Sequence, residues 1–188
     1  MKLFRMAGRD KRKRVAGCLV LLAWALAATC CGPAPKPPPP NVANREGLEF
    51  TGSWNGTGSR RTIALGADRR GSILDLSGTM LLAGPNRPGV GFRAEVIALV
   101  DSATGLVGRS VWTDERGEQV YSELKGEGTA DRNQITGKIL GGTGRYTGIT
   151  GSYEFSWDWV IELEDGAVQG RAVDLKGRVL PGPAGLPK

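Results

Sequence analysis

The chain predicts an all-β fold: a small antiparallel up-and-down β-barrel of about eight to nine strands. Three observations carry the prediction. Between Gly47 and Leu180 apolar residues recur at alternate positions, and no window keeps the i, i+3, i+4, i+7 spacing of an amphipathic helix. Turn-forming residues divide the same stretch at regular intervals, and glycines lie inside the apolar runs. A β-sandwich is the alternative fold.

The clearest strand is predicted over residues 153–163. Its polar face is interrupted only by Val160, and its apolar face consists of Tyr153, Phe155, Trp157, Trp159, Ile161 and Leu163. A second strand is predicted over residues 92–101, where one face is apolar throughout. Ile97 and Leu99 make its other face half apolar as well, so this strand could be covered on both sides.

Turn signals set the number of strands. They lie at Asn55-Gly56, Arg70-Gly71, Pro85–Gly89, Asp101–Gly105, Asp114–Gly117, Ala130–Asn133, Gly141–Gly144 and Asp165-Gly166. Eight turns imply about nine strands, and Asp165-Gly166 is typical of a two-residue hairpin in which both positions take positive φ. Closure of the sheet removes exposed edges, and glycines inside strands permit sharp bends, so a calycin-like barrel is favoured over a sandwich.

The start of the chain predicts export. Seven of the 25 Lys and Arg residues lie in the first fourteen positions, and the run of about fifteen residues that follows, 15–29, is rich in Ala, Leu and Val. This run is shorter than the roughly 20 residues that span a bilayer. We therefore interpret residues 1–30 as a secretory signal peptide, with a short uncleaved anchor as the alternative.

The same segment accounts for the formal net charge of +6, because the rest of the chain carries eighteen basic and eighteen acidic side chains. A neutral domain argues against a nucleic-acid partner. After the signal, residues 31–46 form a proline-rich linker, residues 47–180 the barrel domain and residues 181–188 a flexible tail.

All three cysteines lie in or directly after the signal, so the barrel can form no internal disulfide. Bacterial lipoproteins place a cysteine where the signal ends, and diacylation of its thiol anchors the protein to a membrane. We predict such an anchor at Cys30 or Cys31, which would hold the protein in the periplasm or on the outer surface of the cell. Cleavage near Ala27 with release of the protein is the alternative.

A glycine-rich run lies near the end of the domain: Gly141-Gly142-Thr143-Gly144-Arg145-Tyr146-Thr147-Gly148-Ile149-Thr150-Gly151. It resembles a turn of the allene oxide cyclase-like barrel proteins, which include plant dirigent proteins, bacterial spirotetronate cyclases and many exported bacterial proteins. Residues 114–118 and 123–128 resemble the exported bacterial members. The resemblance covers about forty residues of a domain of roughly 135. It implies a barrel, and it permits a cofactor-independent cyclase or isomerase that acts in the lumen.

The run also has a physical interpretation of its own. Gly141, Gly142 and Gly144 permit a tight turn with positive φ, and Tyr146 can cover one end of a barrel. Phosphate binding by such a run needs a helix directly after it, and a strand follows here instead. We therefore predict a structural turn.

No catalytic group stands out. Histidine is absent, which removes the commonest general base near neutral pH and the commonest zinc ligand. The predicted domain has no cysteine, and its acidic residues lie at turns without the spacing of a calcium loop. We predict no metal and no cofactor, and favour a protein that is not an enzyme.

Candidate ligand contacts are aromatic. Trp112, Trp157 and Trp159 could line a cavity for an apolar ligand, or they could simply fill the core. Tyr121 and Glu123 share a strand face. If this face points inward they become hydrogen-bonding groups for a ligand, and if it points outward they are solvated.

Together these observations predict an exported, lipid-anchored β-barrel of the cell envelope that binds a small apolar ligand or another envelope component. The two alternatives are a cyclase or isomerase that acts in the lumen, and a structural or interaction protein whose barrel is filled. The interior of the barrel distinguishes them.

Overall fold

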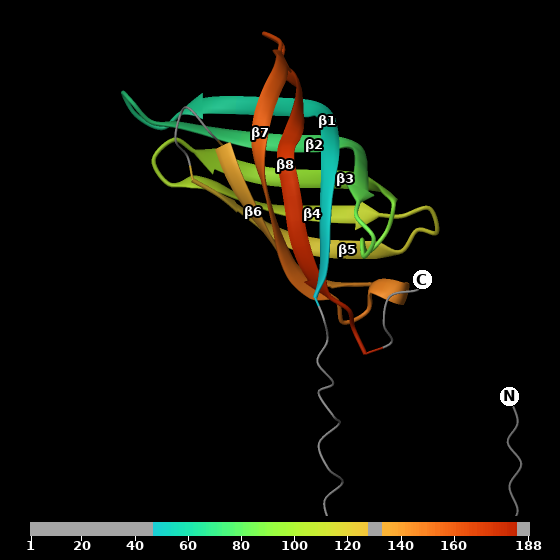
Figure 1. Cartoon of the computed structure of the whole chain (residues 1–188). Coiled ribbons are helices and arrows are strands. Elements are labelled where there is room, and N and C mark those ends of the chain that lie inside the picture. The colour runs from blue at the N-terminus through green and yellow to red at the C-terminus, as the bar shows by residue number, and fades with distance from the viewer. Residues whose placement is uncertain (1–46, 128–132, 184–188) are drawn as a thin grey trace, which may run out of the picture. The chain divides into compact units, whose positions relative to one another are not determined.

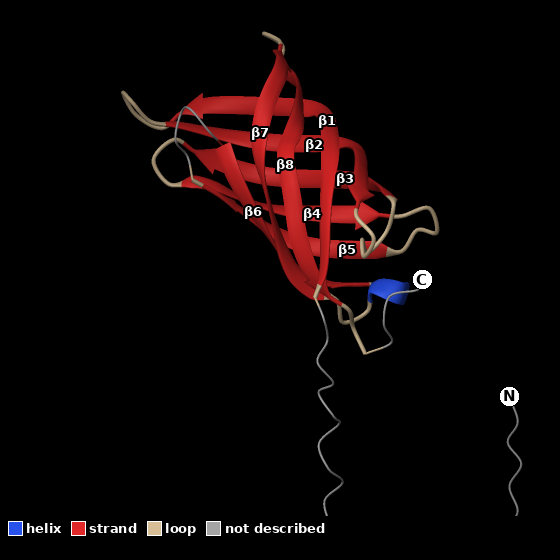
Figure 2. Cartoon of the chain, viewed as in Figure 1, coloured by secondary structure: helices blue, strands red, loops and turns tan. Residues whose placement is uncertain are grey.

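The computed structural model describes residues 47–127 and 133–183. The predicted signal peptide, Cys30, Cys31, the whole predicted linker and most of the predicted tail lie outside the described residues. The fold is all-β, as predicted (Figure 2). The strands are β1 (Leu48–Ala64), β2 (Arg70–Ala83), β3 (Gly91–Asp101), β4 (Gly105–Thr113), β5 (Gln119–Gly126), β6 (Asn133–Gly142), β7 (Thr150–Glu162) and β8 (Ala167–Leu180). No helix in the described part of the chain is long and apolar enough to cross a membrane.

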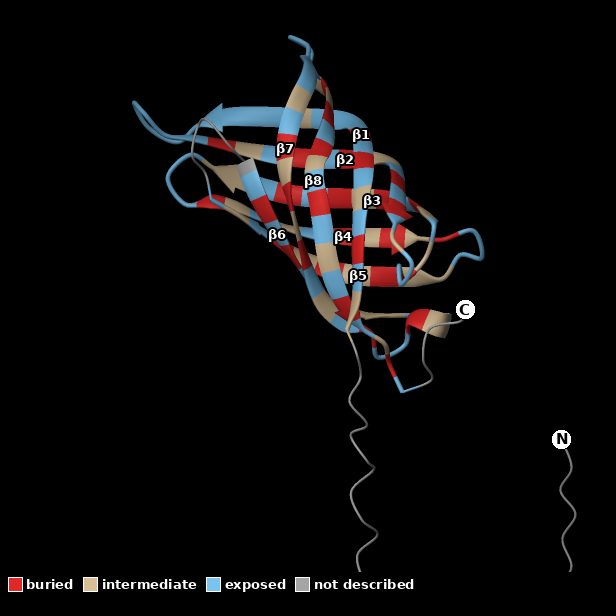
Figure 3. Cartoon of the chain, in the orientation of Figure 1, coloured by how far each residue is buried: buried red, intermediate tan, exposed pale blue. Residues whose placement is uncertain are grey.

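The strands close into a barrel, which excludes the sandwich. Each strand pairs antiparallel with the next one in the chain, and β1 pairs with β8. In Figure 1, β7 and β8 cross over β2–β5, and the short 3-10 helix η1 (Gly144–Tyr146) lies near the lower end of β7 and β8. Buried and exposed residues alternate along the strands (Figure 3), because successive side chains of a strand point to opposite faces.

The barrel has eight strands because Asn55-Gly56 is not a turn. Asn55 pairs with Thr79 on β2, and Gly56 pairs with Gly78 on β2 and Gly170 on β8. A hairpin turn would require the residues on its two sides to pair with each other. Here β1 runs straight on and pairs with a different strand at each edge.

The turn between β7 and β8 also differs from the prediction. Leu163 N–H donates to Ala167 O (2.9 Å), Gly166 N–H donates to Leu163 O (3.0 Å), and Gly166 takes a φ of 89°. Asp165 stays outside the left-handed region. The connection is therefore a longer loop with a single left-handed glycine, which needs positive φ at one position only.

Two glycines show why the strands contain so many of them. A Cβ at Gly137 would overlap the ring of Tyr153, which lies opposite it on β7. A Cβ at Gly170 would overlap the ring of Trp157. The missing side chains let these inward-pointing rings lie against the barrel wall, an arrangement in which the aromatic ring covers the glycine.

Candidate functional site

One end of the barrel, which we call the closed end, is covered by η1. Tyr146 of η1 is fully buried, and its ring lies 5.9 Å from that of Phe92. Ile149, just after η1, is fully buried as well. Gly141 and Gly144, two of the predicted turn glycines, do take positive φ (150° and 52°), whereas Gly142 does not. The glycine-rich run thus folds the chain back across the barrel and inserts Tyr146 as a cap.

Arg145 fastens this cap to the turn between β4 and β5. Its guanidinium forms an ion pair with Asp114, and further ones with Glu115 (3.1 Å) and Glu118 (3.3 Å). The Asp114 side chain is only 1% exposed. It also accepts hydrogen bonds from the backbone N–H groups of Arg116 (2.8 Å) and Glu118 (2.9 Å).

These contacts shift the pKa of both partners. Burial raises the pKa of the Asp114 carboxyl, but the backbone N–H groups and Arg145 outweigh it, so the pKa lies below its usual value. Burial likewise lowers the pKa of Arg145, and Asp114 outweighs it, so that pKa is raised. Both groups are therefore charged at neutral pH, and the closed end contains a buried Asp114–Arg145 ion pair.

The middle of the lumen is packed with rings. Trp112 is 2% exposed and contacts Phe50, Phe92 and Tyr153, with ring centroids 6.4, 5.9 and 4.7 Å away. The hydroxyl groups of Tyr153 and Ser122 are hydrogen-bonded at 2.7 Å. Burial raises the pKa of Tyr153 to about 12, so its hydroxyl stays protonated at physiological pH. A void of about 10 Å³ lies beside Trp112 and Tyr153.

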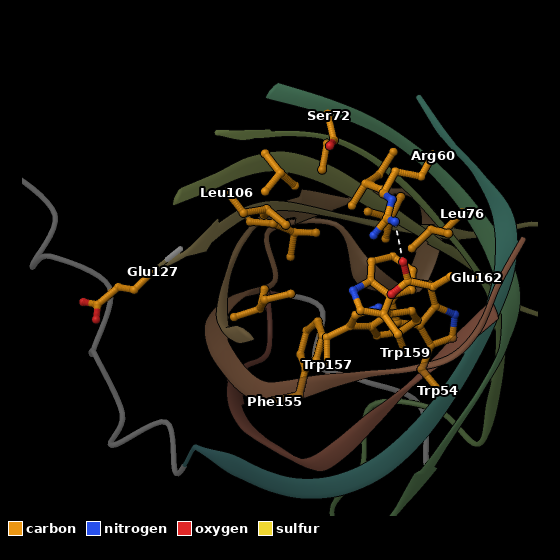
Figure 4. A pocket seen from close by; sticks show the side chains of 16 residues that line it. Trp54, Arg60, Ser72, Leu76, Leu106, Glu127, Phe155, Trp157, Trp159 and Glu162 are labelled. Atoms are coloured by element: carbon orange, nitrogen blue, oxygen red, sulfur yellow. Dashed lines mark hydrogen bonds and ion pairs between the residues drawn. The ribbon is translucent and has the colours of Figure 1, made fainter. Parts of the chain in front are cut away.

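The other end, which we call the open end, contains a cavity of about 310 Å³. Its walls are mostly apolar and come from strands β1 to β7 and from Glu127, just after β5 (Figure 4). They consist of Trp54, Arg60, Ser72, Leu74, Leu76, Val96, Ala98, Val100, Leu106, Leu124, Glu127, Ile135, Phe155, Trp157, Trp159 and Glu162. Because Glu127 and Glu162 are exposed, the cavity opens to solvent at this end. Its volume is at the lower limit of small-molecule sites, about 300–1,000 Å³.

Three tryptophans form one side of the cavity. The rings of Trp54 and Trp157 lie 4.8 Å apart, and Trp159 meets Trp157 edge-on at 5.6 Å. Trp54 and Trp157 are 4% and 6% exposed, and their indole N–H groups have no hydrogen-bond partner among the described residues. A buried donor without a partner costs about 1–3 kcal/mol, so a ligand acceptor that reaches either N–H would relieve that cost.

Arg60 and Glu162 form an ion pair across the mouth of the cavity, above the tryptophans (Figure 4). The Arg60 guanidinium also lies 5.3 Å from the centre of the Trp159 ring. The two side chains are 32% and 40% exposed, so water screens their attraction and the pair is easily opened.

The structure separates the five predicted ligand residues. Trp157 and Trp159 line the cavity, whereas Trp112 is packed below it. Tyr121 and Glu123 lie outside the barrel, because their neighbours Val120, Ser122 and Leu124 fill the inward positions of β5. Tyr121 donates to Gln119 (2.8 Å), and Glu123 lies near Arg109 and Lys125 on the outer wall. The polar face of β5 thus points outward, so Tyr121 and Glu123 do not line the cavity. This corrects their prediction as ligand contacts.

Sequence alternation places Glu162 on the outer face of β7, yet it lines the mouth. The register between β7 and β8 shifts between Trp159 and Ile161, so Val160 is an extra residue in the strand. A shift of one residue exchanges the two faces, which brings Glu162 to the lumen and leaves Ile161 44% exposed. Val160, the apolar exception on the polar face, was the sequence feature that could have indicated this exchange of faces. Arg60 was missed because the supposed turn at Asn55-Gly56 hid that it shares the inward face of Trp54.

Comparison of the chain with protein-family models, with curated proteins and with solved structures finds no match. The fold and the site therefore define the class: an eight-stranded antiparallel β-barrel, capped at one end, with an apolar cavity that opens at the other.

Proposed function

We propose that this protein binds a small, mainly apolar molecule in the cavity at the open end of its barrel, and that it does so as an exported, lipid-anchored protein of the cell envelope. The observation that carries the binding role is the contrast within one lumen. The packed middle of the lumen contains a void of about 10 Å³, whereas the open end contains a cavity of about 310 Å³ behind an apolar lining. Burial of apolar ligand surface there is favourable by roughly 25 cal/mol per Å².

The lining also indicates that the ligand is mainly apolar. The described walls are aromatic and aliphatic, and their charged groups, Arg60, Glu127 and Glu162, are at the mouth. A molecule with an apolar body fits the interior, and one acceptor group could bind the unpaired N–H of Trp54 or Trp157. The resemblance to allene oxide cyclase-like proteins would let the same cavity act on such a molecule, and this alternative stays a prediction.

Two alanines on β3 provide a matched test. Ala98 lines the cavity, whereas Ala94, four residues away on the same face, borders the packed centre. In the full chain, Ala98→Phe should fill the cavity and weaken binding of N-phenyl-1-naphthylamine, measured by fluorescence titration, about tenfold or more. Ala94→Phe should instead lower the melting temperature, because overpacking costs about 1–3 kcal/mol. Equal probe affinity in the parent and Ala98→Phe would refute binding in the lumen.

The anchor is tested separately. If Cys30 or Cys31 carries the lipid, replacing both by Ala should move the protein from the membrane fraction to the soluble fraction of cells. Single replacements would show which thiol is used. Unchanged partitioning of the double variant would contradict the lipid anchor without affecting the proposed binding site.

A further inference from the structure

The outer wall of β2, β3 and β4 carries an apolar patch, which we define as Ile73, Ile97, Leu99 and Val107. These side chains are 50%, 63%, 53% and 54% exposed. Leu99 lies opposite Ile73 on β2 and Val107 on β4, so three of the four form a row across the strands. Ile97 is the next outward residue on β3, and a shallow hollow of about 420 Å³ lies among the four.

The patch is unusual for a surface that faces only water. Single exposed apolar residues are common, but contiguous ones mark interaction sites. The sequence pattern of residues 92–101 shows a second face that is half apolar, which left open a strand covered on both sides, and the barrel itself covers only the inner face. Ile97 and Leu99 on the outer face of β3 are therefore apolar side chains without a cover from the described part of their own chain.

The charges beside the patch indicate what covers it. Asp75 on β2 and Arg109 on β4 lie opposite Ile97 in the same row, one on each side. Asp75 has no ion-pair partner among the described residues, and Arg109 is only loosely paired with Glu123, at 3.9 Å. Opposite charges are thus placed symmetrically about the outward residues of β3.

A two-fold axis along β3 would make this surface complementary to itself. Such an axis places Ile97 against Ile97 and Leu99 against Leu99 of the second copy, and it exchanges the β2 and β4 sides. Asp75 of each copy then faces Arg109 of the other, so two ion pairs flank the apolar contact. Self-complementarity of one patch is the property of a symmetric dimer interface.

We infer that this patch joins two copies of the chain in a symmetric dimer. The inference is independent of the proposed ligand, because the patch is on the outer wall and the cavity on the inner one. Neighbouring outward charges of both signs, Asp75 and Arg109, suit a second copy better than an anionic lipid surface. The apolar residues would be the centre of the interface, and stable interfaces bury about 800 Å² per partner.

Charge exchange tests the arrangement directly in the full chain, kept in a non-ionic detergent and examined by sedimentation velocity over a dilution series. Asp75→Arg alone and Arg109→Asp alone should each weaken dimerisation by about tenfold or more. The double variant should restore it, since the two-fold axis pairs the exchanged charges again. A mixture of the two single variants should also form heterodimers with one repaired charge pair.

The apolar centre is tested by Ile97→Asp, which should abolish the dimer, with Val160→Asp as the control at an exposed apolar position on β7. Leu99→Cys, with Cys18, Cys30 and Cys31 replaced by Ser, should form an interchain disulfide on oxidation, because the axis brings the two copies of residue 99 together. A parent that stays monomeric, or a dimer that survives Ile97→Asp, would overturn the inference. The inference would also be overturned if Ile97→Asp left the oligomeric state unchanged and altered only the binding of the protein to lipid vesicles.

Discussion

The two ends of the barrel are built from the same eight strands but differ in what fills them. At the closed end, rings and a buried ion cluster meet under the η1 cap, and Tyr146 and Ile149 have no exposed surface. At the open end, the wall tryptophans leave about 310 Å³ unfilled, and the ion pair above them is partly exposed. One half of the lumen is thus packed in a way that stabilises the barrel, and the other half keeps the space that the proposed ligand would occupy.

Truncation of one aromatic ring at each end should give the largest difference between the two ends in the free energy of unfolding. Phe92→Ala at the closed end removes a 3% exposed ring and should lower the free energy of unfolding by about 3–5 kcal/mol. Trp159→Ala at the open end removes a half-buried ring that borders space, and should cost about 1 kcal/mol. Urea unfolding measures both values. Equal losses would mean that the open end is packed as tightly as the closed one.

Removal of the buried guanidinium of Arg145 should have the second-largest effect on stability. Arg145→Met leaves the Asp114 carboxylate buried without its partner, which should cost about 3 kcal/mol of unfolding free energy. Probe affinity should stay unchanged, because Arg145 is at the end opposite the cavity. Arg171→Met, at an exposed pair with Asp158 (3.8 Å), serves as the control and should cost about 0.5 kcal/mol or less.

Acid should weaken the closed end more than the open end. The pKa of Asp114 is lowered in the folded state, so its contribution is complete above the unfolded value of 3.8 and is lost as the pH falls through the folded pKa. Melting temperatures between pH 6 and pH 2.5 should therefore fall less steeply in Arg145→Met than in the parent. Asp101, at the open end, has a pKa lowered to about 2 by hydrogen bonds from Arg69 and Ala103. Arg69 is 50% exposed, so water screens its pair with Asp101. Replacement of Asp101 by Asn should therefore change the acid slope less, and the reverse order would contradict the comparison.

The smallest effect on stability is expected at the mouth. Glu162→Gln breaks the exposed pair with Arg60 and should cost about 0.5 kcal/mol or less. Entry of N-phenyl-1-naphthylamine, followed by stopped-flow fluorescence, should become faster because Arg60 is free to move aside. An unchanged entry rate would show that the pair does not gate the cavity.

Much of the fold could be predicted from local patterns. Alternation of Tyr153, Phe155 and Trp157 identified an inward face correctly, because a strand buried on one side repeats every two residues. Tyr146 after the glycine run was expected to cover one end, and it does. The extra strand came from Asn55-Gly56, where a strong local turn signal was overridden by pairing on both sides.

The candidate site was less predictable. Trp157 and Trp159 were placed by alternation, but Glu162 reached the lumen only through the extra residue Val160. Tyr121 and Glu123 could not be placed from composition, since the apolar and polar faces of β5 are equally short. Whether Trp112 packs and Trp159 borders space depends on rings from β1, β3 and β7 that are far apart in the chain.

The sequence by itself determined that residues 48–180 form strands joined by turns, and which face of most strands is apolar, because both properties depend on neighbours within a few positions. Only the tertiary structure decided that the sheet closes at eight strands, and where η1 and the aromatic rings fill the lumen. It also decided that Arg60 and Glu162 meet at the mouth. These properties depend on the register between distant strands and on the volume that their side chains leave, and neither quantity is encoded in a local pattern.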